Sequence, residues 1–219
     1  MDEAVYRGQA GYTPLTLRFY DFWVHGVSNH LAWRCPTREL IAWNNRHISG
    51  NHLDVGVGSG FLLDRARFPV QSPRLALMDL NEASLRHTAR RVARYQPETL
   101  RRNVLEPIEY SGEPFDSIGI NYLLHCLPGA MEEKAVALDH LSALLHPEGV
   151  LYGSTIVREA GRRNPLAAGL FRLYNHKGLF SNREDRREVL EEELSRRFAT
   201  VDLHQKGVVV LFAARGPVR

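Results

Sequence analysis

The sequence is poor in cysteine and lysine, and each scarcity excludes a class of protein. Its 219 residues contain two cysteines, Cys35 and Cys126, which supply neither a disulfide framework nor the spacing of a metal site. Only three lysines are present, so the 28 basic residues are almost all arginines, and they are interspersed with 25 acidic residues. The two cysteines therefore give no reason to expect a metal centre. Because the basic residues form no stripe, we do not expect nucleic-acid binding either.

Patterns for secretion or membrane insertion are also missing. Residues 1–4, Met-Asp-Glu-Ala, lack the basic and apolar pattern with which a signal peptide begins. No run of about 18 apolar residues occurs, so no membrane span or membrane partner is expected. The default expectation is a cytoplasmic protein built on one domain, whose oligomeric state the sequence leaves open.

From Gly50 onward, short apolar runs alternate with amphipathic stretches. Residues 82–95, for example, place Leu85, Ala89 and Val92 at helical spacing. The alternation predicts an α/β fold in which helices cover both faces of a parallel sheet. The expected strands are residues 52–57, 74–79, 99–103, 115–121 and 150–156, with a hairpin of 200–205 and 208–213 around Lys206-Gly207, and the expected helices are residues 82–95, 131–145 and 185–197.

The two ends of the chain differ from this alternating region. Residues 1–48 contain all three tryptophans and are predicted to form an N-terminal helical lid on the main domain of residues 49–219. Residues about 158–182, with glycine, proline and asparagine, are predicted to form an irregular insertion. Ser181 and Glu184 have the spacing of a capping box for the helix that follows this insertion.

The stretch of residues 52–61, HLDVGVGSGF, places three glycines directly after an apolar strand. Such glycines let the backbone approach a ligand closely, because no Cβ intervenes. Dinucleotide-binding folds use the spacing G-x-G-x-x-G, whereas here the third glycine comes one residue earlier. Asp54 lies at the strand end, where a carboxylate suits a cationic amino group better than a pyrophosphate. The stretch therefore disfavours a nicotinamide-dependent oxidoreductase.

A second acid, Asp79, ends the next expected strand. In an open α/β sheet a carboxylate at this place reaches a ribose. Asp54 and Asp79 together therefore indicate a ligand that contains a ribose and carries a positive charge near the glycine-rich turn.

Four stretches in this order, LDVGVGSG, LMDLN, RRNVLEP and FDSIGINYLLHCLPG, resemble the class I S-adenosylmethionine-dependent methyltransferases of the small-molecule type. The resemblance covers residues 50–156 closely. It implies a Rossmann-like, mostly parallel seven-stranded sheet of order 3-2-1-4-5-7-6, with strand seven antiparallel and helices on both faces. It also implies S-adenosyl-L-methionine as the cofactor and S-adenosyl-L-homocysteine as the product.

The resemblance further implies cofactor-binding roles for particular residues. Asp79 would take both ribose hydroxyls, Leu80 would pack on the adenine, and Asp54 would face the methionine portion. Asn103 stands where the family often has aspartate, and its amide oxygen can accept the same hydrogen bond. The full implied set is Tyr20, Asp54, Gly56, Gly58, Gly60, Asp79, Leu80, Asn103, Val104 and Asn121.

The acceptor side is less constrained by these motifs. A base is needed only if the acceptor must lose a proton. His125, one helical turn after the strand at 115–121, is the candidate for a base or an acceptor-orienting group, and Tyr20 is a second candidate near the reaction centre. In the family, insertions at the place of residues 158–182 commonly roof the acceptor pocket. The residues expected to line it are Tyr12, Trp33, Tyr174, Asn175, His176, Phe180 and Asn182.

The implied function is methyl transfer to a small-molecule acceptor, in specialised metabolism. An RNA or protein methyltransferase is an alternative, although no basic stripe or added binding domain supports it. A non-catalytic S-adenosylmethionine-binding protein is another, although intact Asp54, Asp79 and glycines argue against it. The acceptor, and the choice between N-, O- and C-methylation, stay open at this level.

Overall fold

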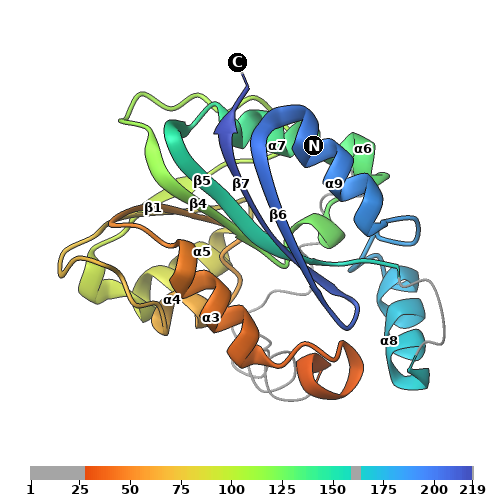
Figure 1. The fold of residues 1–219 in the computed structure, drawn as a ribbon. Coiled ribbons are helices and arrows are strands. Elements are labelled where there is room, and N and C mark those ends of the chain that lie inside the picture. Colours follow the sequence, from red (N-terminus) through yellow and green to blue (C-terminus); the bar gives the residue numbers. More distant parts are fainter. Residues whose placement is uncertain (1–27, 159–163, 219) are drawn as a thin grey trace.

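The central feature of the fold is a seven-stranded sheet. The computed structural model describes residues 28–158 and 164–218, and within them the strand order is β3-β2-β1-β4-β5-β7-β6. This order confirms the fold that the sequence implies. The strands, shown in Figure 1, are β1 (Asn51–Val55), β2 (Arg74–Asp79), β3 (Glu98–Arg101), β4 (Phe115–Asn121), β5 (Leu145–Ile156), β6 (Phe198–Lys206) and β7 (Val209–Pro217).

Strand direction sets where the functional residues gather. The first five strands are parallel, and β7 runs antiparallel between β5 and β6. In the centre, Leu53 of β1 pairs with Ala76 of β2 and with Ile118 of β4. The carboxyl ends of these three strands therefore meet at one edge of the sheet, where ligands bind in open α/β folds.

Helices cover both faces of the sheet (Figure 1). Helices α6 (Met131–Lys134), α7 (Val136–Ser142) and α9 (Arg187–Arg197) contribute to one buried apolar cluster. Helices α3 (Thr37–His47), α4 (Phe61–Asp64), α5 (Glu82–Arg91) and α8 (Pro165–His176) contribute to the other, and η2 (Ala93–Tyr95) and η3 (Leu124–Cys126) are short 3₁₀ turns. Strand β7 serves both clusters, since successive side chains of a strand point to opposite faces.

Helix α3 packs directly on the sheet. The Trp43 indole Nε1 donates a hydrogen bond to the Phe212 carbonyl of β7 at 3.1 Å, and Leu40 is fully buried. We therefore group α3 with the main domain, although the sequence places the lid boundary after it. Residues 1–27 of the expected lid lie outside the described residues.

The expectation that residues 158–182 are irregular is wrong, because α8 occupies twelve of them. Asn164 caps this helix by accepting a hydrogen bond from the Leu166 amide at 3.1 Å, and Pro165 stands in the first turn, where its missing N–H costs nothing. The capping box at Ser181 is also wrong, because α9 begins at Arg187. Among the described residues, no helix is both long and apolar enough to cross a membrane.

Two smaller differences concern element boundaries. The sequence predicts one helix over residues 131–145, whereas the structure divides it at Ala135 into α6 and α7. The hairpin turn comprises Gly207 and Val208, one residue later than expected, because Lys206 still pairs with Val209.

The hairpin turn is pressed against the segment that precedes α3. Gly207 has a φ of 59°, and the neighbouring Val208 amide donates to the Trp33 carbonyl at 3.1 Å. A Cβ on Gly207 would lie 2.1 Å from that carbonyl oxygen and 2.8 Å from the Arg34 Cβ. Only glycine fits this position without displacing the backbone.

We expect Gly207→Ala to lower the free energy of unfolding by about 2–4 kcal/mol, because left-handed strain and overpacking act together. The matched control is Gly169→Ala on α8, where an added Cβ meets no atom within 4 Å. That change should raise stability by about 0.5–1 kcal/mol through helix propensity. Urea unfolding measures both, and equal stabilities for the two variants would contradict this account.

Candidate functional site

The turn that links β1 to α4 has an unusual backbone. Gly56, Gly58 and Gly60 all have left-handed conformations, with φ of 70°, 51° and 72°. L-residues with a Cβ adopt this region rarely, which explains the alternating glycines. A Cβ would lie 2.9 Å from Leu123 at position 56 and 2.8 Å from Thr88 at position 60. At position 58 it would meet nothing within 4 Å, so this glycine faces open space.

Helix α5 holds the turn from behind. Thr88 Oγ1 donates to the Gly58 carbonyl at 3.2 Å, and Arg91 Nη1 donates to the Ser59 carbonyl at 3.1 Å. The Gly56 amide in turn donates to the Met78 carbonyl at 2.8 Å. The turn is thus held by hydrogen bonds to β2 and α5.

Two pockets open on this turn and share Gly56, Gly58 and Tyr122. Together they form a cleft along the carboxyl ends of β1, β2 and β4. The first is lined by Val55, Gly56, Gly58, Met78, Asp79, Leu80, Asn81, Ser84, Arg102, Asn103, Val104, Tyr122, Leu123, Cys126, Leu127 and Pro128. The second is lined by Asp54, Gly56, Val57, Gly58, Ser59, Gly60, Phe61, Leu62, Leu63, Asn121 and Tyr122.

The structure brings the expected cofactor-binding residues to this one cleft. The nine that lie in the described part of the chain all line one pocket or both: Asp54, Gly56, Gly58, Gly60, Asp79, Leu80, Asn103, Val104 and Asn121. Tyr20, with Tyr12 of the acceptor side, lies outside the described residues.

Asp79 stands at the end of β2 and forms part of the wall of the first pocket. Its Oδ1 accepts a hydrogen bond from the Asn81 amide at 2.8 Å. Burial raises the pKa of Asp79 to about 6, although the backbone amides of Asn81, Gly58 and Val57 lower it. The carboxylate is therefore ionised at neutral pH at some cost to the fold, and it can accept hydrogen bonds from ligand hydroxyls.

Asp54 lies at the opposite end of the cleft and is 8% exposed. Burial raises the pKa of this carboxyl group, and His52 lowers it. His52 Nε2 is 3.8 Å from Asp54 Oδ1, and it is buried without a hydrogen-bond partner among the residues that the structure describes. A buried carboxylate favours a cation on the ligand, which offsets the cost of its burial.

A polar network behind Asp54 fixes Asn121. Ser154 Oγ donates to Asn121 Oδ1 at 3.1 Å, while Asn121 Nδ2 lies 3.4 Å from Asn44 Oδ1. The same Asn44 oxygen accepts from the Tyr152 hydroxyl at 2.9 Å. Sequence reasoning did not find Asn44 or Tyr152, because they belong to α3 and β5 and share no local motif with Asn121.

Besides the regions around Asp79 and Asp54, a third corner of the cleft is formed by the turn after β3. Asn103 Oδ1 accepts from the Leu105 amide at 3.1 Å, and Asn103 Nδ2 donates to Glu106 at 2.9 Å. His140 Nδ1 lies 2.9 Å from the Val104 carbonyl oxygen, which ties the turn to α7. Val104 is buried, and it shares the first pocket with Leu80 and so supplies an apolar wall there.

Tyr122 is a site residue that sequence reasoning missed. It follows β4 directly, lines both pockets, and has a φ of 57°, which is uncommon outside glycine, asparagine and aspartate. Its hydroxyl donates to Asn29 Oδ1 at 2.9 Å. Its position immediately after Asn121, which was expected to bind the cofactor, is the sequence feature that could have identified it.

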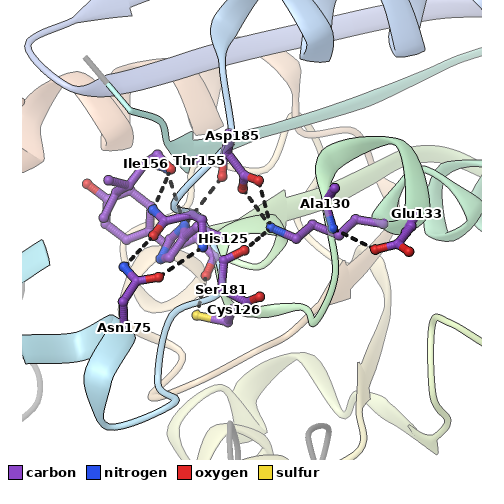
Figure 2. Close-up of polar contacts among 12 residues, drawn as sticks. His125, Cys126, Ala130, Glu133, Thr155, Ile156, Asn175, Ser181 and Asp185 are labelled. Atoms are coloured by element: carbon purple, nitrogen blue, oxygen red, sulfur yellow. Dashed lines mark hydrogen bonds and ion pairs between the residues drawn. The ribbon is translucent and has the colours of Figure 1, made fainter. Parts of the chain in front are cut away.

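His125 is buried in η3 and lines neither pocket. Its Nδ1 accepts a hydrogen bond from the Ile156 amide at 3.3 Å, and Thr155 Oγ1 lies 3.4 Å from the same nitrogen (Figure 2). Burial and, to a smaller extent, the charge of Lys134 lower the pKa of His125 to about 3. The ring is therefore neutral and carries its proton on Nε2.

An aromatic cluster extends from the cleft through His125. The ring of His125 lies 5.4 Å from Tyr122 and 4.5 Å from Phe180, centroid to centroid, with edge-to-face geometry in both pairs. Phe180 continues the cluster to Tyr174 at 5.0 Å and to Trp33 at 6.2 Å. Three of the residues expected on the acceptor side thus lie together next to His125.

The remaining acceptor-side residues are placed differently. His176 is exposed at the end of α8. Asn175 Nδ2 donates to Asn182 Oδ1 at 2.9 Å, and Asn182 Nδ2 donates to the Ile156 carbonyl at 2.8 Å. These two amides therefore connect α8 to the end of β5.

Comparison with known proteins gives consistent results. The model of the methyltransferase domain family matches residues 53–151. The demethylluteothin O-methyltransferase of Streptomyces thioluteus is 39% identical over 98% of this chain and 93% of its own. The physcion biosynthesis cluster O-methyltransferase of Aspergillus chevalieri is 37% identical over 96% of each. The crystal structure of the N-methyltransferase NodS of Bradyrhizobium japonicum, 16% identical, superposes with a TM-score of 0.63 over 99% of this chain and 98% of that one.

We expect Asp79→Asn to separate ligand binding from stability. Losing one charge-assisted hydrogen bond costs about 1.5–3 kcal/mol, so the affinity for S-adenosylmethionine should fall by about 10- to 100-fold. The fold should gain about 1–3 kcal/mol at pH 8, because the pKa of Asp79 in the folded protein, about 6, lies above its ordinary value of 3.8. This gain in stability is fully present above pH 6. It vanishes below about pH 4, where Asp79 is neutral in both the folded and the unfolded wild-type protein.

Isothermal titration and urea unfolding across pH 4–8 measure these two effects. The matched control is Asp116→Asn, which removes the same charge from an exposed position of β4 that lines neither pocket. The control should change neither quantity. An Asp79→Asn protein that binds the cofactor as tightly as the wild type would contradict the assignment of Asp79.

Proposed function

The chain belongs to the S-adenosylmethionine-dependent methyltransferases, which act here on small molecules, and we propose that it methylates a hydroxyl oxygen of its acceptor. The observation that carries the choice of oxygen is the likeness to two O-methyltransferases at 39% and 37% identity over nearly the whole chain. The aromatic cluster beside the cleft supports an acceptor with a flat, unsaturated ring.

The cleft suits the cofactor at each of its three corners. In this proposal Asp79 holds the ribose hydroxyls, and Leu80 and Val104 enclose the adenine. Asp54 receives the ammonium group of the methionine portion. The missing side chain at Gly58 supports this arrangement, because the space that a Cβ would occupy is open between the two pockets. When bound, the cofactor supplies a methyl group on a positively charged sulfur.

The residues of the chain contribute mainly by positioning. Holding an acceptor oxygen in line with the methyl group supplies much of the rate acceleration of such a displacement. His125 suits an orienting role better than a base role, since its Nδ1 is occupied by the Ile156 amide and its Nε2 carries the proton. We therefore propose a phenolic or enolic hydroxyl, which is more acidic than an alcohol and so needs less help from a base.

The alternatives receive less support. Methylation of RNA or protein would favour an open, basic acceptor face, whereas aromatic side chains adjoin the cleft here. A protein that only binds the cofactor has no need of the aromatic cluster beside it. In this proposal the protein acts in the cytoplasm, where the thiols of Cys35 and Cys126 stay reduced.

The test is methyl transfer from labelled S-adenosylmethionine to a panel of phenols, enols and amines, with the product analysed for the methylated atom. We expect O-methyl products whose rate rises with pH as the acceptor hydroxyl ionises. His125→Asn should lower kcat by less than about tenfold, whereas removal of a general base costs about 10²–10⁴-fold. Label on nitrogen or carbon alone would overturn the choice of oxygen, and a 10³-fold loss in His125→Asn would restore the base role.

A further inference from the structure

A fully buried ion pair lies beside the aromatic cluster and outside the cofactor cleft. Lys134 Nζ, at the end of α6, lies 2.9 Å from Asp185 Oδ1 and 2.7 Å from Oδ2. The side chains are 0% and 1% exposed, and neither residue lines either of the two pockets of the cofactor cleft. Figure 2 shows Asp185 reaching toward this contact from the segment that follows α8.

Such a pair is a costly way to stabilise a fold. Burial lowers the pKa of Lys134 and raises that of Asp185, and in each case the charge of the partner opposes the shift. Well-packed apolar residues usually stabilise a fold as well as a buried ion pair does. Stability alone therefore does not account for this pair, and its contacts suggest a positioning role.

The pair fixes residues 179–185, which we call the roof segment, over η3. Lys134 Nζ also donates to the Ser181 carbonyl, and the Ser181 amide donates to the His125 carbonyl at 2.8 Å (Figure 2). The contact thus runs from the ammonium group through the backbone of Ser181 to the backbone of His125.

A second set of bonds fixes the same segment from the other side. Asn182 Nδ2 donates to the Ile156 carbonyl, and the Ile156 amide donates to the ring of His125. The Asp185 carbonyl accepts from the Arg158 amide at 2.7 Å. Phe180 directly precedes Ser181 in the roof segment, and its amide donates to the Tyr174 carbonyl at 3.2 Å. The position of the Phe180 ring against His125 therefore depends on how the roof segment is held.

We propose that Lys134 and Asp185 are positioning residues for the acceptor: their buried contact holds the roof segment so that Phe180 and His125 form one rigid wall of the acceptor site. This inference rests on the proposed function, which is what assigns this wall to an acceptor site. It adds a control of acceptor binding by two residues that line neither pocket of the cofactor cleft.

The test compares two double variants with the wild-type protein. Lys134→Met with Asp185→Leu removes both charges and every bond of the pair without leaving an unpaired buried charge. Lys134→Gln with Asp185→Asn keeps polar groups that can still bond to each other and to Ser181. The acceptor is whichever phenol, enol or amine the wild-type protein methylates best, so a wrong choice of oxygen appears in the wild-type product and not in the comparison of variants.

For the apolar double variant we expect an acceptor KM at least tenfold higher and an S-adenosylmethionine Kd within twofold of wild type. Hydrogen exchange of the roof segment should become at least tenfold faster, while exchange in β1 and β4 stays unchanged. The amide double variant should restore the KM to within about threefold. An apolar variant that folds with normal KM and normal exchange in the roof segment would overturn the proposal and leave the pair a purely structural element.

A single variant keeps the proposal testable if the apolar double variant does not fold. Phe180→Ala removes the part of the wall that the pair is inferred to position, and Phe180 is only partly buried. We expect it to raise the acceptor KM at least tenfold with the cofactor Kd unchanged. A normal KM in Phe180→Ala would overturn the proposal independently of the ion pair. The matched control is Leu173→Ala, at an exposed position of α8, which should change neither constant.

Discussion

The backbone reversal after β1 is the constraint on which the rest of the site depends. Three residues of one short turn occupy the left-handed region, and at two of them the space for a side chain is already filled by Leu123 and Thr88. This turn brings the chain from the central strand into α4 and leaves an opening beside Gly58. The cleft exists because α5 supports the turn from behind, through Thr88 and Arg91. The shape of the site is thus supported by hydrogen bonds within the protein itself.

The cleft combines two buried carboxyl groups whose ionisation opposes folding. The pKa values of Asp54 and Asp79 are both raised by burial, and the charge of Asp54 raises the pKa of Asp79 as well. A ligand that brings hydroxyl donors to Asp79 and a positive charge to Asp54 lowers the cost of keeping both carboxylates ionised. Under the proposed function, part of the binding energy of the cofactor therefore offsets a cost that the folded protein carries, as is usual where stability and function compete.

Sequence reasoning found the parts of the fold and site that follow from local patterns. The glycine spacing, Asp54 and Asp79 were predictable because each stands at a strand end with a recognisable neighbour, and the nine expected residues that the structure describes line one cleft. Helix α8 was missed because Gly169 and Asn175 obscure its apolar periodicity. The burial of His125 and the pairing of Lys134 with Asp185, 51 residues apart, were not predictable. They depend on how η3, α6 and the roof segment meet in space, and no local pattern encodes that meeting.

The bonds that hold the roof segment have one common property: most of them end on main-chain atoms. Lys134 reaches the carbonyl of Ser181, the amide of Ser181 reaches the carbonyl of His125, and Asn182 reaches the carbonyl of Ile156. Main-chain atoms are present whatever the residue type, so mutation of the intervening side chains leaves this scaffold in place. Under the proposed function, exchange of Phe180 or Tyr174 would therefore change the wall that faces the acceptor while the main-chain bonds of the roof segment stay in place. The same fold could then keep one cofactor cleft and accept different small molecules.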